Sequence, residues 1–490
     1  MNRKWLAILM SGSLITGAGG TYIGMKWLDY KSPSELEQHT GKLPGVTLTE
    51  GTNHTTLAKV EQAYDLILQR YVEKVGEKQL IEGAIKGMLT TLDDPYSVYM
   101  DQNTAKQFSD SLDSSFEGIG AEVSESDGKI IIVSPFKNSP AEKAGVKPND
   151  QIIKVDDTSV EGLDLYEATL KIRGKKGTTV KLEILRSGLK EPITVNIKRD
   201  EIPVETVHSA VKMENGEKIG YLELTSFSEN TAEDFKKQLK ELEKDEIEGL
   251  VIDVRGNPGG LLSSVEEILK ELVTEKKPYV QIEMRDGEKK RYFSSLKREK
   301  DYPIVVLVDK GSASASEILA GALKEAQGYQ VIGETTFGKG TVQQAVPMGD
   351  GSNIKLTLFK WLTPDGNWIH KQGVKPDIEV KQSELYQAHP LQIEKPLKID
   401  MNNEQVKNAQ TILKGLGYDP GRLDGYFNSR TELSVKAFQR QHTLNPTGEI
   451  DKKTAESLEA EVIKAVRKEE NDLQLQTALK LAAVAASDLK

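Results

Sequence analysis

Val308-Asp-Lys-Gly-Ser-Ala-Ser-Ala-Ser-Glu-Ile318 places three serines between a β-branched run and a run of residues that favour a helix. A second segment, Gly338-Lys-Gly-Thr-Val-Gln343, carries a lysine between two glycines and a glutamine four residues beyond that lysine. The two segments therefore offer a nucleophile, a base other than histidine and a residue to orient that base. This set of groups is sufficient for hydrolysis through an acyl-enzyme.

The composition limits the class of protein. A chain of 490 residues is too long for one hydrophobic core, so two to four domains are expected. With 37% hydrophobic and 29% charged residues it is ordinary globular material. The net charge of −10, without a basic stripe, argues against a nucleic-acid partner. The absence of cysteine excludes disulfides, thiolate metal sites and cysteine nucleophiles, and it suits a bacterial protein outside the cytoplasm.

The N-terminus carries an export signal. Arg3 and Lys4 precede an uncharged run at 5–25, which is long enough to cross the roughly 30 Å hydrocarbon layer as a helix. Two interpretations remain, an uncleaved anchor, which we favour, and a signal peptide cleaved near 17–20. In both, the cations keep the N-terminus cytoplasmic and the rest of the chain is exported.

Composition and periodicity divide the chain into seven segments. They are 1–27, the signal anchor or signal peptide; 28–53, a polar linker; 54–110, a helical segment; 115–200, short strands with one short helix; 203–400, alternating strands and helices; 403–458, a compact helical domain; and 459–490, an exposed helical tail with a ragged end. Because strands alternate with helices in the longest segment, we expect an α/β sheet there.

Histidine, a metal ion and lysine are the alternatives for the group that activates the serine. None of the six histidines has a Gly-rich or strand-end setting beside an acid, yet a Ser-His-Asp triad stays open because its members meet only in space. No metal-ligand spacing is present, so neither a metal nor a cofactor is expected. A lysine can serve as base when burial lowers its pKa. Gln343 shares a face with Lys339 in a helix or in a strand. Alternatively, Lys339 is a solvated loop residue.

The two segments, together with Asp253-Val-Arg-Gly-Asn-Pro-Gly-Gly260, closely resemble the C-terminal processing (tail-specific) serine protease family. The resemblance implies a multidomain α/β protein whose Ser-Lys protease core has a crotonase/Clp-like sheet and helices. It also implies that Ser314 is the nucleophile, that Lys339, 25 residues later, is the base, and that Gln343 orients the base. Ser312 and Ser316 are then structural.

A nucleophilic serine at position 314 also predicts an oxyanion hole. A nucleophile at a helix start can use the next backbone N–H, here that of Ala315, where the helix dipole favours negative charge. A second donor requires a close backbone approach, which suits glycine. The resemblance points to Gly259 or Gly260, of which we favour Gly260. The alternative for Asn257-Pro-Gly-Gly260 is a surface turn.

Residues 115–200 resemble a PDZ domain, through Asn138–Asp150 and Gln151–Asp156. The resemblance implies an inserted β-barrel-like domain in which the following strand pairs with an extended peptide. The residues that would receive the carboxylate of a protein tail are Phe116, Gly118, Ile119 and Gly120. We interpret Arg173, at the end of the PDZ helix, as a gating contact to the protease core. A solvent-facing cation at a helix end is the alternative.

Residues 403–458 resemble the small all-α peptidoglycan-binding domain of cell-wall enzymes, through Leu416-Gly-Tyr-Asp-Pro-Gly421 and Asp424-Gly-Tyr-Phe427. The resemblance implies peptidoglycan as a partner. The family also implies a homodimer, formed through the helical N-terminal segment 54–110 and through 370–400.

The sequence therefore predicts an extracytoplasmic serine endopeptidase that cleaves proteins near their C-termini and is anchored in the membrane or secreted to the bacterial cell wall. A non-catalytic wall-bound PDZ scaffold is the alternative, although intact Ser314, Lys339 and Gln343 argue against it. A carbohydrate-active wall enzyme would need a paired-carboxylate motif, which we do not find.

Overall fold

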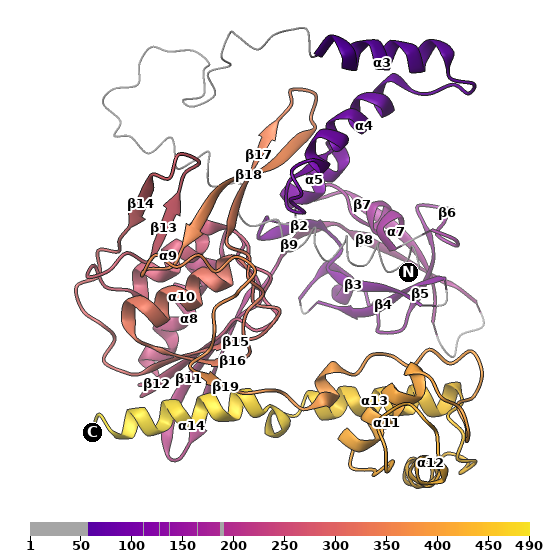
Figure 1. The fold of residues 1–490 in the computed structure, drawn as a ribbon. Helices are drawn as coiled ribbons and strands as arrows, with labels where there is room; N and C mark the ends of the chain where they lie inside the picture. Colours follow the sequence, from indigo (N-terminus) through magenta and orange to yellow (C-terminus); the bar gives the residue numbers. More distant parts are fainter. Residues whose placement is uncertain (1–56, 111, 127, 137, 164, 187–190) are drawn as a thin grey trace. The chain divides into compact units, whose positions relative to one another are not determined.

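A computed structural model describes residues 57–490 except 111, 127, 137, 164 and 187–190 (Figure 1). The predicted signal segment and the linker 28–53 lie outside the described residues. Among the helices that are described, none is both long and apolar enough to cross a membrane. The chain forms two compact units. The second unit consists of Val207–Ser226, Ala232–Gln344 and Thr357–Lys490, and the remainder forms the first.

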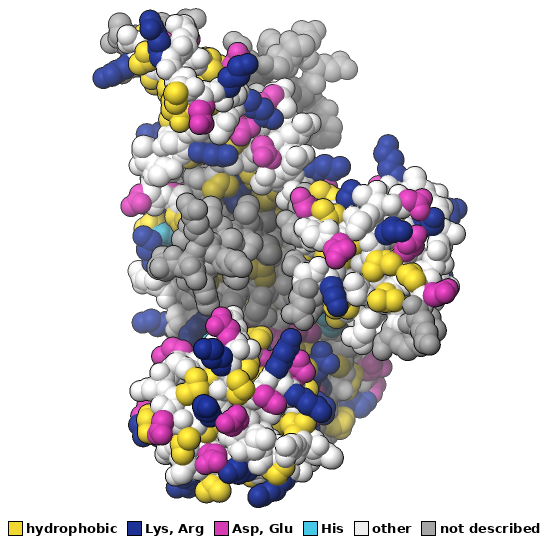
Figure 2. Space-filling model, turned by 90° about the vertical axis from the view of Figure 1, so that its right-hand side faces the viewer, with side chains coloured by type: hydrophobic (Ala, Val, Ile, Leu, Met, Phe, Trp, Pro, Cys, Tyr) yellow, Lys and Arg dark blue, Asp and Glu magenta, His cyan; other side chains and the backbone are white. Residues whose placement is uncertain are grey.

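The first unit begins with helices, as the periodicity of 54–110 predicts. These are α3 (Leu57–Arg70), α4 (Glu77–Thr90) and, after the short strand β1 (Val98–Met100), α5 (Gln102–Asp110). Neither α3 nor α4 buries a residue. Both nevertheless carry large apolar side chains that are exposed, namely Leu57, Val60, Leu66, Ile67, Ile81 and Met88. Figure 2 shows apolar side chains on this part of the surface, at the upper end of the view.

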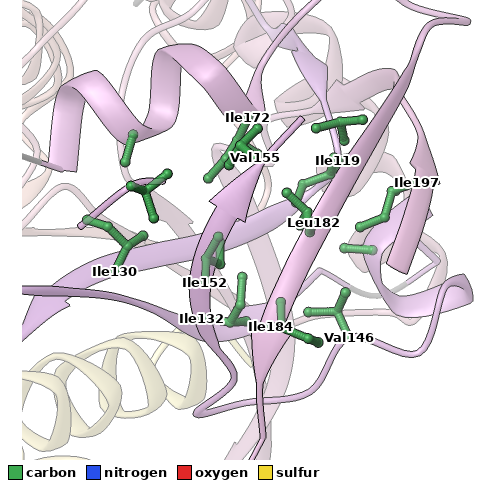
Figure 3. Close-up of a cluster of buried hydrophobic side chains, with 14 residues drawn as sticks. Ile119, Ile130, Ile132, Val146, Ile152, Val155, Ile172, Leu182, Ile184 and Ile197 are labelled. Atoms are coloured by element: carbon green, nitrogen blue, oxygen red, sulfur yellow. The ribbon is translucent and has the colours of Figure 1, made fainter. Parts of the chain in front are cut away.

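The segment predicted to be a PDZ domain is a six-stranded antiparallel sheet with two helices. The strand order is β3-β4-β5-β7-β8, and β6 pairs with β5. The elements are β3 (Ala121–Ser126), β4 (Lys129–Pro135), α6 (Pro140–Lys143), β5 (Gln151–Val155), β6 (Thr158–Ser159), α7 (Leu165–Ile172), β7 (Thr179–Leu185) and β8 (Ile193–Lys198). Alternate residues of β7 point inward, so Val180, Leu182 and Ile184 join a cluster of buried aliphatic side chains (Figure 3).

The second unit is built on a six-stranded sheet in the order β10-β11-β12-β15-β16-β19, parallel except for β10. The strands are β10 (Val207–Glu214), β11 (Glu217–Leu224), β12 (Gly249–Asp253), β15 (Ile304–Val308), β16 (Gln330–Gly333) and β19 (Ile378–Glu379). Every residue of β12 and β15 is buried, as expected for parallel strands covered on both faces. Figure 1 shows α8 (Thr231–Lys244), α9 (Leu262–Leu272) and α10 (Ala315–Gln327) on one face and α14 (Leu473–Ser487) on the other.

A second, antiparallel sheet accompanies this core. Its five strands are β1 together with β13 (Val280–Glu283), β14 (Lys289–Tyr292), β17 (Thr341–Pro347) and β18 (Asn353–Leu362). The end of β18 pairs with β13, and its beginning pairs with β1. The α/β fold class predicted from the sequence is confirmed, but this sheet was not predicted.

The chain ends in helices. α11 (Glu404–Gly415), α12 (Ser429–Gln441) and α13 (Lys452–Val466) form the small all-α domain around their own buried cluster. Short 3-10 turns, η2 (Glu384–Gln387) and η3 (Glu469–Asn471), flank this domain.

The expectation of an exposed tail at 459–490 is wrong. Helix α14 packs a stripe of small apolar residues against the core sheet, with Leu475, Ala478, Leu479, Ala482 and Ala483 buried. The prediction of exposure failed because an alanine-rich segment indicates only a high helix propensity. Small side chains also let a helix lie close to a sheet and bury its apolar face there.

Candidate active site

Ser314 lies where β15 turns into α10, and it is the N-cap residue of that helix. Its backbone has φ 54° and ψ −111°, which is unfavourable for a residue with a side chain and must be held by its surroundings. The two flanking serines supply part of that support. The Ser312 hydroxyl donates to the carbonyl of Val254, and the Ser316 hydroxyl donates to the carbonyl of Asn257, both at 2.8 Å. Both flanking serines thus hold the turn against the loop that follows β12.

The loop after β12 approaches Ser314 closely. Gly259 has φ 106°, and a Cβ on it would lie 2.9 Å from Ser314 Cβ and 2.8 Å from the carbonyl oxygen of Ala313. Only glycine fits there. The Gly259 N–H donates to Asn257 Oδ1 (2.8 Å), while Asn257 Nδ2 donates to Leu224 O (2.7 Å). The Gly259 N–H is thus held within the loop. Asn257–Gly260 is thus a packed loop and not a surface turn.

Lys339 lies between β16 and β17 and is fully buried, so the solvated-loop alternative is wrong. Its carbonyl accepts a hydrogen bond from Trp361 Nε1 (2.8 Å). The flanking glycines are required by close packing. A Cβ on Gly338 (φ 91°) would lie 3.0 Å from the backbone nitrogen of Gln372, and one on Gly340 would lie 2.8 Å from the backbone nitrogen of His370.

Gln343 is the third residue of β17 and is also fully buried. Its Nε2 donates to the hydroxyls of Thr341 (2.9 Å) and Thr357 (3.1 Å). The two threonines fix the orientation of the amide. Within the described part of the chain, Gln343 Oε1 is a buried acceptor that has no hydrogen-bond partner. A buried acceptor of this kind suits a nearby ammonium or amine donor.

Glu317, a residue with no predicted role, connects these segments. Its Oε2 accepts the backbone N–H groups of Ser314 and Lys339, each at 2.8 Å. Its Oε1 accepts the Thr336 hydroxyl (2.5 Å) and the Gly338 N–H (2.6 Å). Burial raises the pKa of Glu317, while these four hydrogen bonds oppose the rise. The signal in the sequence is an acidic residue three positions after a serine N-cap, a capping box.

Two further observations concern the histidine and metal alternatives for the base. His370 Nδ1 accepts the Gly340 N–H at 3.4 Å, and its ring stacks on Trp368, so this histidine contacts backbone beside Lys339. In the part of the chain that the structure describes, no group of three or more His, Asp or Glu residues could hold a metal ion.

The predicted tail-binding residues come from one strand and the turn after it. Phe116 and Gly118 lie in β2 (Ser115–Gly118), which pairs with β9 (Asp200–Pro203). Ile119 is buried, and Gly120 (φ 74°) packs so closely that a Cβ there would lie 2.5 Å from Ser139 Cβ. The next strand, β3, is the last in its sheet and pairs only with β4 among the described strands. This leaves an edge for an added strand.

Arg173 follows α7, and its guanidinium lies over the Phe116 ring, 4.7 Å from the ring centre. The residue is exposed, as the helix-end alternative predicts, but it also contacts the predicted carboxylate loop. It therefore lies at one end of the strand edge offered by β3.

Comparisons with known proteins agree with this architecture. The model of Peptidase family S41 matches residues 218–380, and the PDZ domain model matches 118–197. The model of a putative peptidoglycan binding domain matches 402–458, and the model of the activating protease CtpB N-terminal domain matches 14–104. The fold thus defines a multidomain peptidase with a PDZ domain and a peptidoglycan-binding domain.

Relatives of similar length identify the family of this chain more narrowly. Over 480 residues, 98% of this chain and 99% of the relative, it is 60% identical to the carboxy-terminal processing protease CtpB of Bacillus subtilis (strain 168). It is 45% identical over 428 residues to CtpA of the same organism, covering 87% of this chain and 90% of the relative. A probable CtpA-like serine protease of Staphylococcus haemolyticus (strain JCSC1435) is 36% identical over 434 residues, covering 88% and 86%. The chain therefore belongs to peptidase family S41, among the carboxy-terminal processing serine proteases.

Proposed function

We propose that this protein cleaves other proteins near their C-terminal ends through a Ser314–Lys339 dyad. The observation that carries the proposal is the carboxylate of Glu317, which binds the backbone N–H groups of both Ser314 and Lys339. One buried side chain thus fixes the spacing between a serine at a helix start and a fully buried lysine.

The chemistry follows from these positions. Ser314 attacks the scissile carbonyl and gives its proton to Lys339, which later passes a proton to the leaving amine. Burial supports the neutral amine that this step requires, because an ammonium group is poorly solvated in a protein interior. The unpaired Oε1 of Gln343 supports a role in orienting the lysine. The Ala315 and Gly260 N–H groups bind the oxyanion of the tetrahedral intermediate.

The PDZ domain selects the tails. The turn at Ile119 and Gly120 receives the terminal carboxylate through backbone N–H groups, and the tail extends the sheet along β3. The stacking of Arg173 on Phe116 supports a part for this arginine in sensing an occupied turn. That the similar Bacillus protein is named a carboxy-terminal processing protease supports the same substrate class.

The location and assembly follow from other parts of the chain. The peptidoglycan-binding domain supports a position at the bacterial cell wall, outside the cytoplasm, with the uncharged run at 5–25 as anchor or signal. The exposed apolar residues of α3 and α4 support a homodimer through the N-terminal helices.

The test is cleavage of an unfolded protein with a free C-terminus by the purified protein and its variants. Ser314→Ala and Lys339→Ala should each abolish cleavage. Lys324→Ala is the matched control, because Lys324 lies on α10 in an ion pair with Asp377 and should be dispensable. Cleavage by Ser314→Ala at the rate of the unchanged protein would contradict the dyad. No cleavage by the unchanged protein would favour the scaffold, and loss of cleavage only in a histidine variant would favour a triad.

A further inference from the structure

The two ends of the segment that contains the peptidoglycan-binding domain are joined by hydrogen bonds. Gln382 follows β19 before this segment, and Asp472 follows η3 after it. Gln382 Nε2 donates to Asp472 Oδ1 at 2.6 Å, and the Leu473 N–H donates to Gln382 Oε1 at 3.2 Å. Asp472 is also the N-cap residue of α14, since its Oδ1 accepts the Leu475 N–H at 2.9 Å.

The same carboxylate holds an arginine from the centre of the core. Arg255 Nη1 and Nη2 donate to the two oxygens of Asp472, each at 2.9 Å, in the two-pronged geometry that carboxylates and guanidinium groups prefer. Nη1 also donates to Gln474 Oε1 at 3.1 Å. Although burial opposes ionisation of Asp472, its hydrogen bonds with Arg255 lower the pKa of Asp472, so the pair is ionic.

On its other side, Arg255 is bound by the end of β12. Nε donates to both oxygens of Asp253, and Nη2 donates to Asp253 Oδ2 at 2.6 Å. The Tyr221 hydroxyl donates to the same Oδ2 at 2.8 Å. The guanidinium therefore lies between two carboxylates, one beside the loop and one at the start of α14.

Arg255 immediately precedes the loop that approaches Ser314. The next residue, Gly256, donates its N–H to Asp309 Oδ1 at 2.7 Å, and Gly259 packs against Ser314 two residues after Asn257. Asp253 accepts hydrogen bonds from Nε and Nη2 of Arg255, whereas the charged partner of Nη1 is Asp472. Arg255 is four residues before Gly259 and five before Gly260 in the chain.

We propose that Asp472 is a positioning residue for the active-site loop Gly256–Gly260. It holds Arg255 from α14 and so fixes the place of the Gly260 N–H relative to Ser314. This inference rests on the proposed function, because the loop matters to catalysis only as the oxyanion donor. It gives the C-terminal helix, 217 residues away in sequence from Arg255, a part in the reaction.

The test is the effect of Asp472→Asn on steady-state cleavage of a peptide substrate by the full-length protein. Asparagine also caps helices well, so the start of α14 is kept while the charge that holds Arg255 is lost. We expect kcat to fall about 10- to 100-fold with KM within about twofold, because an oxyanion donor acts in the transition state and not in substrate binding. Arg255→Lys, a second variant, loses the two-pronged contact and should show the same pattern.

Lys490→Ala is the matched control. Lys490 forms ion pairs with Glu217 and Glu248 at the other end of α14, so its loss weakens the attachment of the helix without touching the loop. It should leave kcat unchanged. A normal kcat for Asp472→Asn, or an equal loss of kcat in Lys490→Ala, would overturn the inference. Ser314→Ala is assayed in parallel. Cleavage by that variant overturns the proposed function together with this inference, whereas its inactivity beside a normal kcat for Asp472→Asn overturns this inference alone.

Discussion

Glu317 Oε2 accepts the backbone N–H of Lys339 at 2.8 Å, so an acidic residue on the first turn of α10 holds the segment that carries the buried lysine. The same oxygen accepts the N–H of Ser314. The carboxylate therefore acts on the backbone of both segments.

Glu317→Gln tests this arrangement. One oxygen of the carboxylate would be replaced by an NH₂ group facing backbone N–H or hydroxyl donors, which leaves buried donors unpaired at a cost of about 1–3 kcal/mol. We expect cleavage to fall at least about 100-fold, with a lower melting temperature. Glu325→Gln, on the same helix but only half-buried and accepting hydrogen bonds from the Asp365 N–H and Asn367 Nδ2, should keep activity. Full activity of Glu317→Gln would show that the spacing of the two segments does not depend on this carboxylate.

Gly259→Ala tests the close approach of the loop to the nucleophile. The new Cβ would meet Ser314 Cβ at 2.9 Å, so we expect cleavage to fall about 100-fold or more. Gly256→Ala is a matched control, because Gly256 also has a positive φ (64°) but has open space where its Cβ would lie. Alanine at the left-handed φ of Gly256 costs about 1–2 kcal/mol of backbone strain, whereas Gly259→Ala has a φ outside that region and the clash in addition. Equal activities in the peptide assay would contradict the packing described here.

The free energy of unfolding should decrease as pH rises because of Glu266. Burial raises the pKa of this carboxyl, which lies on α9 beside the Tyr279 hydroxyl, from 4.5 to about 7. Between these values the native protein keeps a proton that the unfolded chain has released, so the free energy of unfolding decreases as pH rises. Glu266→Gln removes this effect. It should match the unchanged protein near pH 4.5 and exceed its unfolding free energy by up to about 3 kcal/mol above pH 7.

Urea denaturation at several pH values measures this difference. The neighbouring Glu267 provides a control of opposite sign. It lies in ion pairs with Lys236 and Lys270, which, against the effect of burial, lower the pKa of Glu267. Glu267→Gln should therefore reduce stability at neutral pH, by less than about 1 kcal/mol because the pairs are partly exposed. A pH-independent effect of Glu266→Gln would contradict this account, because it would mean that the pKa of Glu266 is the same in the folded protein as in the unfolded chain.

The apolar surface of α3 and α4 predicts self-association. Leu66→Lys combined with Met88→Lys should convert a dimer into a monomer, because lysine at these positions would put charges into an apolar interface. Light scattering of the eluted protein reports the mass directly. Leu433→Lys changes an equally exposed leucine on α12 and should leave the mass unchanged. A dimer that survives the double substitution would require another interface.

Local patterns predicted the elements that have their own hydrophobic signal. The strands Gln151–Val155 and Ile304–Val308 have such a signal, since β-branched residues dominate both. The strand Lys289–Tyr292 has no such signal, because it is polar and exposed and exists only by pairing with β13. A sheet of this kind depends on partners far away in sequence.

The candidate site divides in the same way. The resemblance to the protease family singled out Ser314, Lys339 and Gln343, and the structure accounts for the glycines beside Lys339 through their close packing. The capping role of Glu317 has no clear signal in the sequence, because three serines that alternate with alanines make the helix start ambiguous. The link between Arg255 and Asp472 has no local signature at all, because their contact depends on how α14 docks on the sheet.

The most direct test of the Ser314–Lys339 dyad is to trap the acyl-enzyme. The protein is mixed with a peptide ending in an activated ester, quenched in acid, digested, and mapped by mass spectrometry. Such an ester makes acylation fast relative to hydrolysis of the intermediate, so the acyl group should accumulate. We predict an acyl group on Ser314 in the unchanged protein and at least about a 100-fold slower appearance in Lys339→Ala. An acyl group on another residue, or an equal rate in Lys339→Ala, would contradict the dyad.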